Sequence, residues 1–252
     1  MSQDHVRCTD CGTVINTDKD KTDTLAPCPT CGSFKRTATG FAGSLQPSKY
    51  TLDNFVAYKL SELVKCGVPE LDGNADWLGA FILNSVFIAK LAPKPRAYAF
   101  NFLRRAEGAL SSYRAARLDL IQYVQTPRNV LSPYFRALLH FESCISLTYQ
   151  GLALLATAAG EKKPFDSGDK SKEERLYKLY IHSKHMDGII ESGQIPTDAT
   201  AALWITNEGL ACSKATLSFE ELVSLLKWIA EMADRISKFD FGSGSGRDAS
   251  PT

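Results

Sequence analysis

The sequence predicts a mainly α protein in which a helical bundle follows a small β segment at the amino terminus. Two observations predict this fold class: from about residue 53 onward apolar residues recur at helical spacing, and two pairs of cysteines precede them. The 252 residues are 44% hydrophobic and 23% charged, which fits one main domain and a small appendage. We expect a first domain and linker at 1–46, a helical domain at 47–239 and a disordered Gly/Ser-rich tail at 240–252.

The amino-terminal cysteines form two Cys-x2-Cys pairs separated by sixteen residues: Cys8, Cys11, Cys28 and Cys31. Each pair can direct two thiolates at one tetrahedral ion, with bonds of roughly 2.3 Å, and Gly12 and Gly32 relieve the tight turns. With the β-branched run and polar turn between the pairs, residues 5 to about 36 resemble the zinc-ribbon family. The resemblance implies a two-stranded ribbon around one structural Zn²⁺, because four thiolates leave no coordination position for a water nucleophile.

Apolar periodicity predicts the helices of the body. We expect an amphipathic helix at 53–66, with Asp53 as its N-cap, and a largely buried helix at 75–91. A long amphipathic helix at 97–125, which Pro127 ends, and an apolar central helix at 133–159 should follow. A polar loop at 160–171 separates them from a further helix that ends near Gly193. Short loops favour antiparallel neighbours, so we expect an all-helical bundle.

Two further elements follow near the carboxyl end. Residues 201–212 predict a short buried strand or an irregular packing segment, with Asn207 and Gly209 in a turn. Ser218 precedes Glu221 by three residues, as in a capping box that begins the last helix.

Charge is unevenly distributed, although the formal net charge is only +1. Residues 94–136 carry eight basic side chains against two acidic ones, which favours docking on the acidic half of the fold or of a second subunit slightly over contact with a polyanion. The candidate nucleic-acid contacts are Arg104, Arg105, Arg114, Arg117 and Lys178. Basic and acidic residues cancel across the ribbon, so we expect it to contact protein or to stabilise the chain rather than to bind nucleic acid directly.

The compartment is predicted from two features. The amino terminus lacks the apolar stretch of a signal peptide, and the most apolar windows, 77–89 and 145–159, are shorter than the roughly 20 residues of a membrane span. Seven cysteines, four of them in metal-binding spacing, suit a reducing compartment. We therefore expect a cytoplasmic protein.

The stretch RLYKLYIHSKH at 175–185 places Arg175 and His182 seven residues apart, so both face the same side of a helix, and His185 follows one turn later. A guanidinium beside an imidazole could hold a scissile phosphate and move a proton during attack by a 2′-hydroxyl. Arg175, His182 and His185 are therefore the candidate catalytic residues. The alternative is that they pair with neighbouring elements or lie in a polar dimer seam.

Arg175, six intervening residues and His182 match the motif of the HEPN superfamily of all-α domains, and Tyr180 to His185 match a Tyr-x-x-x-Lys-His element of HEPN-like domains. The chain resembles that superfamily over roughly residues 130–238. The resemblance implies a homodimer in which both motifs line one cleft, and a metal-independent ribonuclease in a defence or toxin system. Leu176, where HEPN nucleases generally carry a polar residue, departs from the pattern.

Three functions follow from these patterns. The first is a HEPN-like protein that acts on or beside RNA or other nucleic acid. The second is a non-catalytic protein-interaction or assembly module that uses the ribbon and the basic helical face. The third is a regulator whose basic helix contacts DNA. Phosphate binding should weaken steeply with ionic strength, whereas an apolar protein interface should not.

Overall fold

The computed structural model describes residues 5–15, 27–33, 36–39, 68–71, 73, 76–87, 91–125, 131–195 and 200–239. The chain divides into two compact units, Met1–Gln46 and Pro47–Thr252. The predicted helix at 53–66 and the predicted tail at 240–252 lie outside the described residues. The prediction of a mainly α protein with a small β ribbon is confirmed.

The amino-terminal unit contains three short strands: β1 (His5–Cys8), β2 (Val14–Ile15) and β3 (Arg36–Thr39). They form an antiparallel sheet in the order β2-β1-β3, with Val6 opposite Ile15 and Cys8 opposite Arg36. The predicted two-stranded ribbon is therefore corrected to three strands. The residues after the second cysteine pair supply the added strand, which is too short to show an alternating pattern in the sequence.

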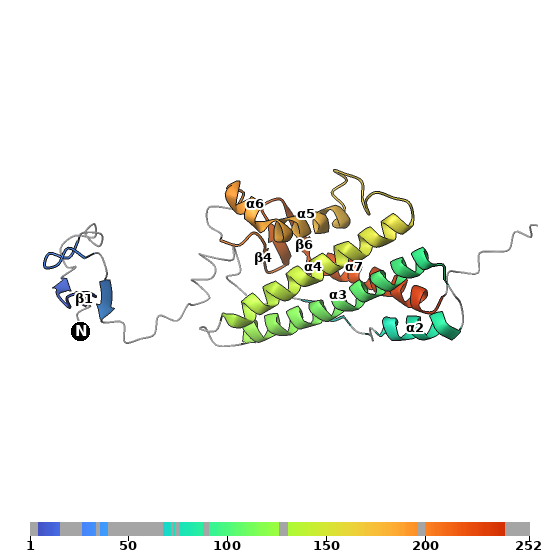
Figure 1. The fold of residues 1–252 in the computed structure, drawn as a ribbon, viewed down its shortest axis with the longest axis horizontal. Helices are drawn as coiled ribbons and strands as arrows, with labels where there is room; N and C mark the ends of the chain where they lie inside the picture. The colour runs from blue at the N-terminus through green and yellow to red at the C-terminus, as the bar shows by residue number, and fades with distance from the viewer. Residues whose placement is uncertain are drawn as a thin grey trace, which may run out of the picture. The chain divides into compact units, whose positions relative to one another are not determined.

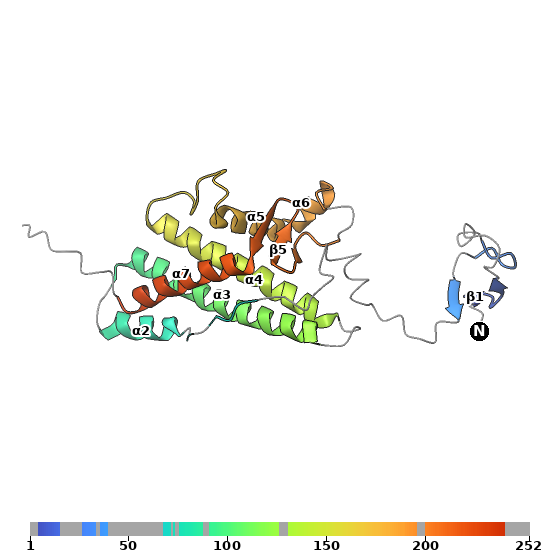
Figure 2. The same ribbon diagram turned by 180° about the vertical axis from the view of Figure 1, so that it is seen from behind.

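The helical unit is organised around two long helices, α3 (Pro93–Gln125) and α4 (Ser132–Ala158), which lie side by side along most of their length (Figure 1). Gly108 allows this close approach, because a Cβ atom there would meet a methyl carbon of Leu147 at 3.0 Å. Helix α7 (Phe219–Ser237) crosses the pair on the face seen in Figure 2, and α2 (Trp77–Phe87) packs against α3 and α7. Helices predicted at 75–91, 97–125 and 133–159 are confirmed.

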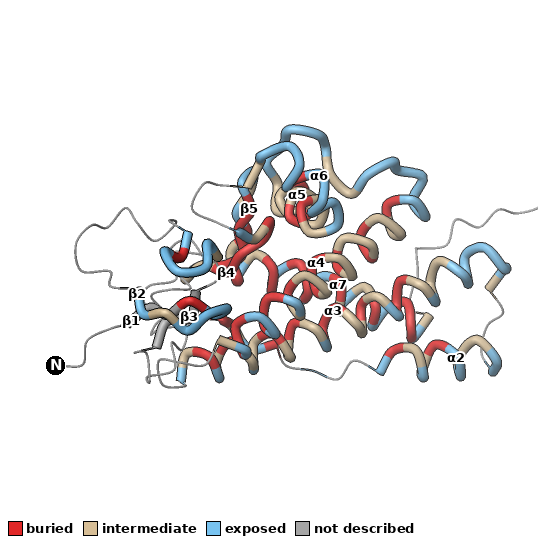
Figure 3. The backbone as a smooth tube through the Cα atoms, turned by 60° about the vertical axis from the view of Figure 1, so that its left-hand side comes forward, coloured by how far each residue is buried: buried red, intermediate tan, exposed pale blue. Residues whose placement is uncertain are grey.

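Aromatic side chains fill the space between these helices. The rings of Tyr113, Tyr134 and Phe141 are fully buried, and the Tyr113 hydroxyl donates to the Pro69 carbonyl oxygen at 2.7 Å. The ring centroids of Phe141 and Phe219 lie 5.5 Å apart, which joins α4 to α7. Burial is concentrated where α3, α4 and α7 face one another (Figure 3).

Helices α5 (Lys172–Lys184) and α6 (Met186–Glu191) lie beside a second antiparallel sheet (Figure 1). Its strands β4 (Trp204–Ile205), β5 (Gly209–Cys212) and β6 (Ala215–Ser218) pair in sequence order. The short buried strand expected within 201–212 is confirmed by β4 and β5, whereas β6 was not predicted, and the all-helical body is corrected to a helical bundle with a small second sheet. Strands of two to four residues are too short to reveal a period. Gly209 begins β5 rather than lying in the turn, and a Cβ atom there would lie 2.1 Å from the Leu217 carbonyl oxygen.

Hydrogen bonds of capping side chains fix where α5 and α7 begin. The Ser171 side chain accepts from the Glu174 backbone N–H at the start of α5. At the start of α7 the Ser218 hydroxyl accepts from the Glu221 N–H, and the Glu221 carboxylate accepts from the Ser218 N–H, both at 3.1 Å. The capping box predicted from the sequence is confirmed.

Candidate functional site

The four amino-terminal cysteines lie in two turns of the same local geometry. In the first turn Gly12 donates its backbone N–H to the Cys8 carbonyl oxygen, and in the second Gly32 donates to that of Cys28, at 2.9 and 2.8 Å. Both glycines have positive φ values, +72° and +70°, which side chains with a Cβ rarely adopt. Each turn thereby directs two sulfur atoms to one side, as the sequence analysis predicted.

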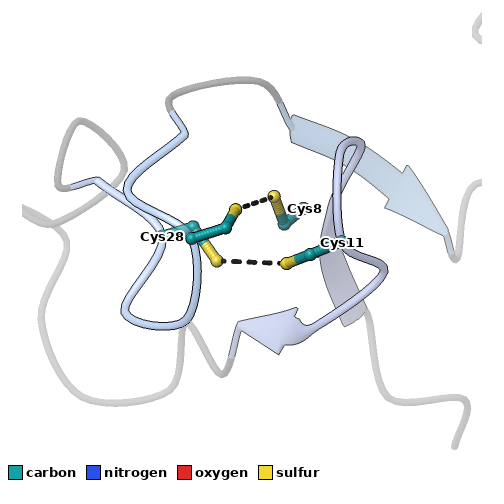
Figure 4. A group of neighbouring side chains, drawn as sticks. Cys8, Cys11 and Cys28 are labelled. Atoms are coloured by element: carbon teal, nitrogen blue, oxygen red, sulfur yellow. Dashed lines mark hydrogen bonds between the residues drawn. The ribbon is translucent and has the colours of Figure 1, made fainter.

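The two turns face each other with their sulfur atoms clustered (Figure 4). All four Sγ atoms lie within 4.8 Å of one another; the Sγ atoms of Cys8 and Cys31 are 3.5 Å apart, and those of Cys11 and Cys28 are 3.6 Å apart. Tetrahedral zinc with bonds of about 2.3 Å would separate its sulfur ligands by about 3.8 Å. The residues Cys8, Cys11, Cys28 and Cys31 therefore have the number, type and spacing needed to hold one metal ion.

The thiols influence one another strongly. Hydrogen bonds with Thr13 lower the pKa of Cys11 to about 6. For Cys31 the backbone N–H of Ser33 acts to lower the pKa, but the neighbouring thiols outweigh it and raise the pKa to about 12. A hydrogen bond from the Thr30 backbone is the main cause that lowers the pKa of Cys28 as well, so the cluster favours negative charge on Cys11 and Cys28 and resists it on Cys31. A bound divalent cation would remove that resistance, because the metal ligand is the thiolate.

Side chains outside the cysteines join the two turns to each other. The Thr13 hydroxyl donates to the Thr30 hydroxyl at 3.1 Å, and the Ser33 hydroxyl donates to the Asp10 carboxylate at 2.7 Å. Both contacts link the first cysteine pair with the second. They help to fix the distance between the pairs, as outer contacts of a metal site commonly do.

Arg175, a candidate catalytic residue, is engaged by α7 and by the second sheet. Its guanidinium forms a bidentate ion pair with the Glu221 carboxylate, with one contact at 3.0 Å, and donates to the Thr216 carbonyl oxygen at 3.3 Å. Burial acts to raise the pKa of Glu221, but the hydrogen bonds from Arg175 and from the Ser218 backbone outweigh it and lower that pKa. One carboxylate thus completes the capping box of α7 and binds the arginine of α5.

His182 is buried, with 4% of its surface exposed, and both ring nitrogens have partners. Its Nδ1 lies 2.9 Å from the Lys178 carbonyl oxygen, so Nδ1 must carry the proton and donate it. Its Nε2 lies 3.2 Å from the Ser213 hydroxyl, which donates a hydrogen bond to the neutral ring. The structure brings Arg175 and His182 to the same β5–β6 hairpin, whereas His185 is exposed at the end of α5.

The candidate basic residues divide into one that is exposed and four that contact the chain. Arg114 and Arg117 donate to the carbonyl oxygens of Leu71 and Val68, at 3.2 and 3.1 Å. Arg105 donates to the Gln150 side chain at 2.9 Å, and the Lys178 ammonium lies 3.3 Å from the Glu174 carboxylate. Arg104 is exposed on α3. Arg114 and Arg117 therefore hold residues 68–71 against α3.

Helix α2 exposes an apolar surface that the sequence analysis missed. The helix was predicted to be largely buried, but of its residues only Trp77 and Phe81 are buried. Four large apolar side chains on its outer face are between 50% and 79% exposed: Ile82, Leu83, Val86 and Phe87. The correction has a physical reason: a helix that is apolar all round has the same pattern whether the chain itself or another molecule covers it. We call these four residues the α2 outer face.

No family model matches the chain, and neither the curated proteins nor the solved structures contain a significant match to it. Among the helices that the structure describes, none combines the length and apolarity needed to cross a bilayer.

Proposed function

We propose that this protein is a non-catalytic protein-interaction module, in which a zinc-stabilised ribbon is joined to a mainly helical domain that binds a partner protein. The exposed α2 outer face carries the proposal. Monomeric proteins rarely expose a contiguous apolar surface of this kind unless it is a binding site, because its transfer out of water is favourable. The partner would cover the α2 outer face, which the described residues of the chain leave exposed.

The contacts of the candidate chemical residues support this proposal. The guanidinium of Arg175 is neutralised by Glu221, and both nitrogens of His182 are used by Lys178 and Ser213. A substrate phosphate would have to displace Glu221 from Arg175, at the expense of the α7 cap. These side chains therefore serve to join α5 to the β5–β6 hairpin and to α7.

The ribbon has a structural role in this proposal, with zinc as the metal that suits four thiolates. Cys8 and Cys28 are its buried side chains among those that the structure describes, so metal binding must supply most of its folding free energy. We expect one zinc ion per chain, measured by mass spectrometry under native conditions or by a colorimetric zinc assay.

The HEPN-like ribonuclease interpretation stays a prediction, and so do the homodimer, nucleic-acid binding and a cytoplasmic location. Cleavage of mixed single-stranded and structured RNA by the zinc-loaded protein, lost in folded Arg175→Ala and His182→Ala variants, would contradict the proposal. So would RNA binding that weakens steeply with salt and depends on Arg104, since this is the behaviour of phosphate contacts.

The direct test compares two variants of the full chain. Leu83→Asp with Phe87→Asp makes the α2 outer face polar, while Arg104→Glu changes an exposed charge on α3. Partner proteins captured by the wild type and retained at high salt should be lost with the first variant and kept with the second. Equal capture by all three proteins would refute a role for α2, and circular dichroism must show that each variant is folded.

A further inference from the structure

A groove between α2 and the amino-terminal part of α3 adjoins the α2 outer face. Its volume is about 400 Å³, and apolar side chains from both helices form its walls, among them Ile82, Val86, Pro93 and Phe100. Phe81 lines its inner side and is held in place by stacking on Phe239, with ring centroids 5.5 Å apart. The groove is therefore backed by the fixed core, whereas Ile82 and Val86 are both at least half exposed.

The spacing of the exposed side chains fits a helical partner. Ile82 and Val86 are four residues apart, and Leu83 and Phe87 repeat that spacing beside them, so they form two adjacent ridges along α2. A helix with an apolar stripe can lay that stripe between such ridges and the facing side chains of α3. Its side chains at positions i, i+3 and i+4 would then enter the groove.

The polar groups around the groove indicate the charge of that partner. Arg96 lines the groove; its side chain is exposed and has no ion-pair partner within the described residues. Within the described part of the chain, no acidic residue lines the groove. The groove thus presents a basic group, Arg96, and no acidic one among the described residues, which favours an acidic partner.

We propose that the groove between α2 and α3 binds an amphipathic helix of a partner protein, with the apolar stripe of that helix between Val86 and Phe100 and an acidic residue at Arg96. This assignment rests on the proposed function and names its partner class. A second copy of the chain fits less well, because a symmetric contact would place one basic rim near another. A flat lipid surface would leave the concave part of the groove unfilled.

The test uses the full, zinc-loaded chain and a displayed library of helical peptides. Every peptide carries the same apolar stripe, and the flanking positions vary between Glu, Gln and Lys. Selection on the wild type should enrich Glu at the flanks. The best Glu peptide and its all-Lys counterpart are then synthesised with a fluorophore, and their affinities are measured by anisotropy.

Three variants locate the site. Arg96→Glu reverses the charge of the groove's basic residue and should weaken the Glu peptide about 10-fold while strengthening the Lys peptide. Ile82→Asp with Val86→Asp should abolish binding of both. Arg104→Glu makes a similar charge change on the same helix outside the groove lining, and should leave both affinities within about two-fold.

The outcomes separate this inference from the proposed function. Enrichment of Lys or of no charge, with binding still lost in the Ile82 and Val86 variant, would overturn the acidic partner and leave the interaction module standing. Absence of any peptide or captured protein that depends on α2 would overturn both. Self-association in light scattering, or binding to phosphatidylserine vesicles, that is lost in the same variant would assign the groove to a second copy or to a membrane and overturn the inference.

Discussion

In the ribbon the buried side chains that the structure describes are Cys8 and Cys28, whereas the helical domain buries whole aromatic rings such as Tyr113 and Phe141. The two regions must therefore derive their stability from different sources. A few short strands bury little apolar surface against the conformational entropy of ordering the chain, so we expect the ribbon to depend on metal–thiolate bonds. The helical domain has a continuous core and needs no such bond. This difference predicts which perturbation affects which region.

Removal of the metal gives the largest expected effect, and it should be confined to the ribbon. A strong chelator, or Cys28→Ser, removes binding free energy of about 10–16 kcal/mol in comparable sites, so the ribbon should unfold. The amide signals of residues 5–15 and 27–39 should collapse in a ¹H–¹⁵N NMR spectrum, while the melting temperature of the helical domain stays unchanged. A decrease in that temperature would show that the two regions do not fold independently.

The reverse experiment perturbs the helical core. Phe141 is fully buried on α4 between Tyr113 and Phe219, so Phe141→Ala should destabilise the helical domain by about 3–5 kcal/mol. Phe87→Ala is the matched control, because Phe87 is 79% exposed and its truncation should cost little. Urea unfolding followed by circular dichroism measures both, and zinc content should not change in either. An equal decrease in the free energy of unfolding for the two variants would show that Phe87 packs within the chain despite its exposure.

The contacts of α5 rank next, because they are polar rather than apolar. His182→Ala removes a buried ring and leaves the Ser213 hydroxyl without this partner, and should cost about 1–3 kcal/mol. His185→Ala, three residues further along, changes an exposed side chain and should cost less than about 0.5 kcal/mol. The same urea experiment compares them. A smaller loss for His182 than for His185 would contradict the packing role argued for α5.

These α5 residues illustrate what the sequence could and could not predict. The start of α5 and the capping box of α7 were predicted correctly, because they depend on local spacing. The end of α5 was not: the helix was expected to continue to near Gly193, but it ends at Lys184 and the short helix α6 follows. Pairing with neighbouring elements was one of the alternatives that the sequence left open, but the sequence could not identify Glu221 and Ser213 as the partners of Arg175 and His182, because both residues fold back from later in the chain. The cysteine cluster was predicted completely, since all of its geometry lies in two short turns. Long-range contacts leave no such local pattern.

Acid should weaken the helical domain through Glu174. Backbone N–H groups of Gly168 and Lys170 donate to its carboxylate and hold its pKa below the usual range. A carboxyl with a depressed folded pKa stabilises the fold above its unfolded pKa, so this contribution should disappear as the pH falls below about 4.5. Glu174→Gln should lower the melting temperature at pH 7 and flatten its dependence on pH between 5 and 3, relative to the wild type. Because Asp169 and Glu221 shift in the same direction, some dependence on pH should remain in the variant. An unchanged slope would assign the acid sensitivity to those two residues instead.

The smallest expected change in stability belongs to the α2 outer face, and it distinguishes a binding surface from a core. Leu83→Asp with Phe87→Asp should alter the free energy of unfolding by no more than about 0.5 kcal/mol for each site, because both side chains are already in water in the folded chain. Urea unfolding measures that change, and partner capture measures the function. Had these residues been buried within the chain, two inserted carboxylates would unfold it, since an unpaired charge in a core is far too costly. If the variant is folded but no longer binds its partner, the α2 outer face contacts another molecule. If the variant is unfolded, the α2 outer face is buried within the chain, as the sequence first predicted.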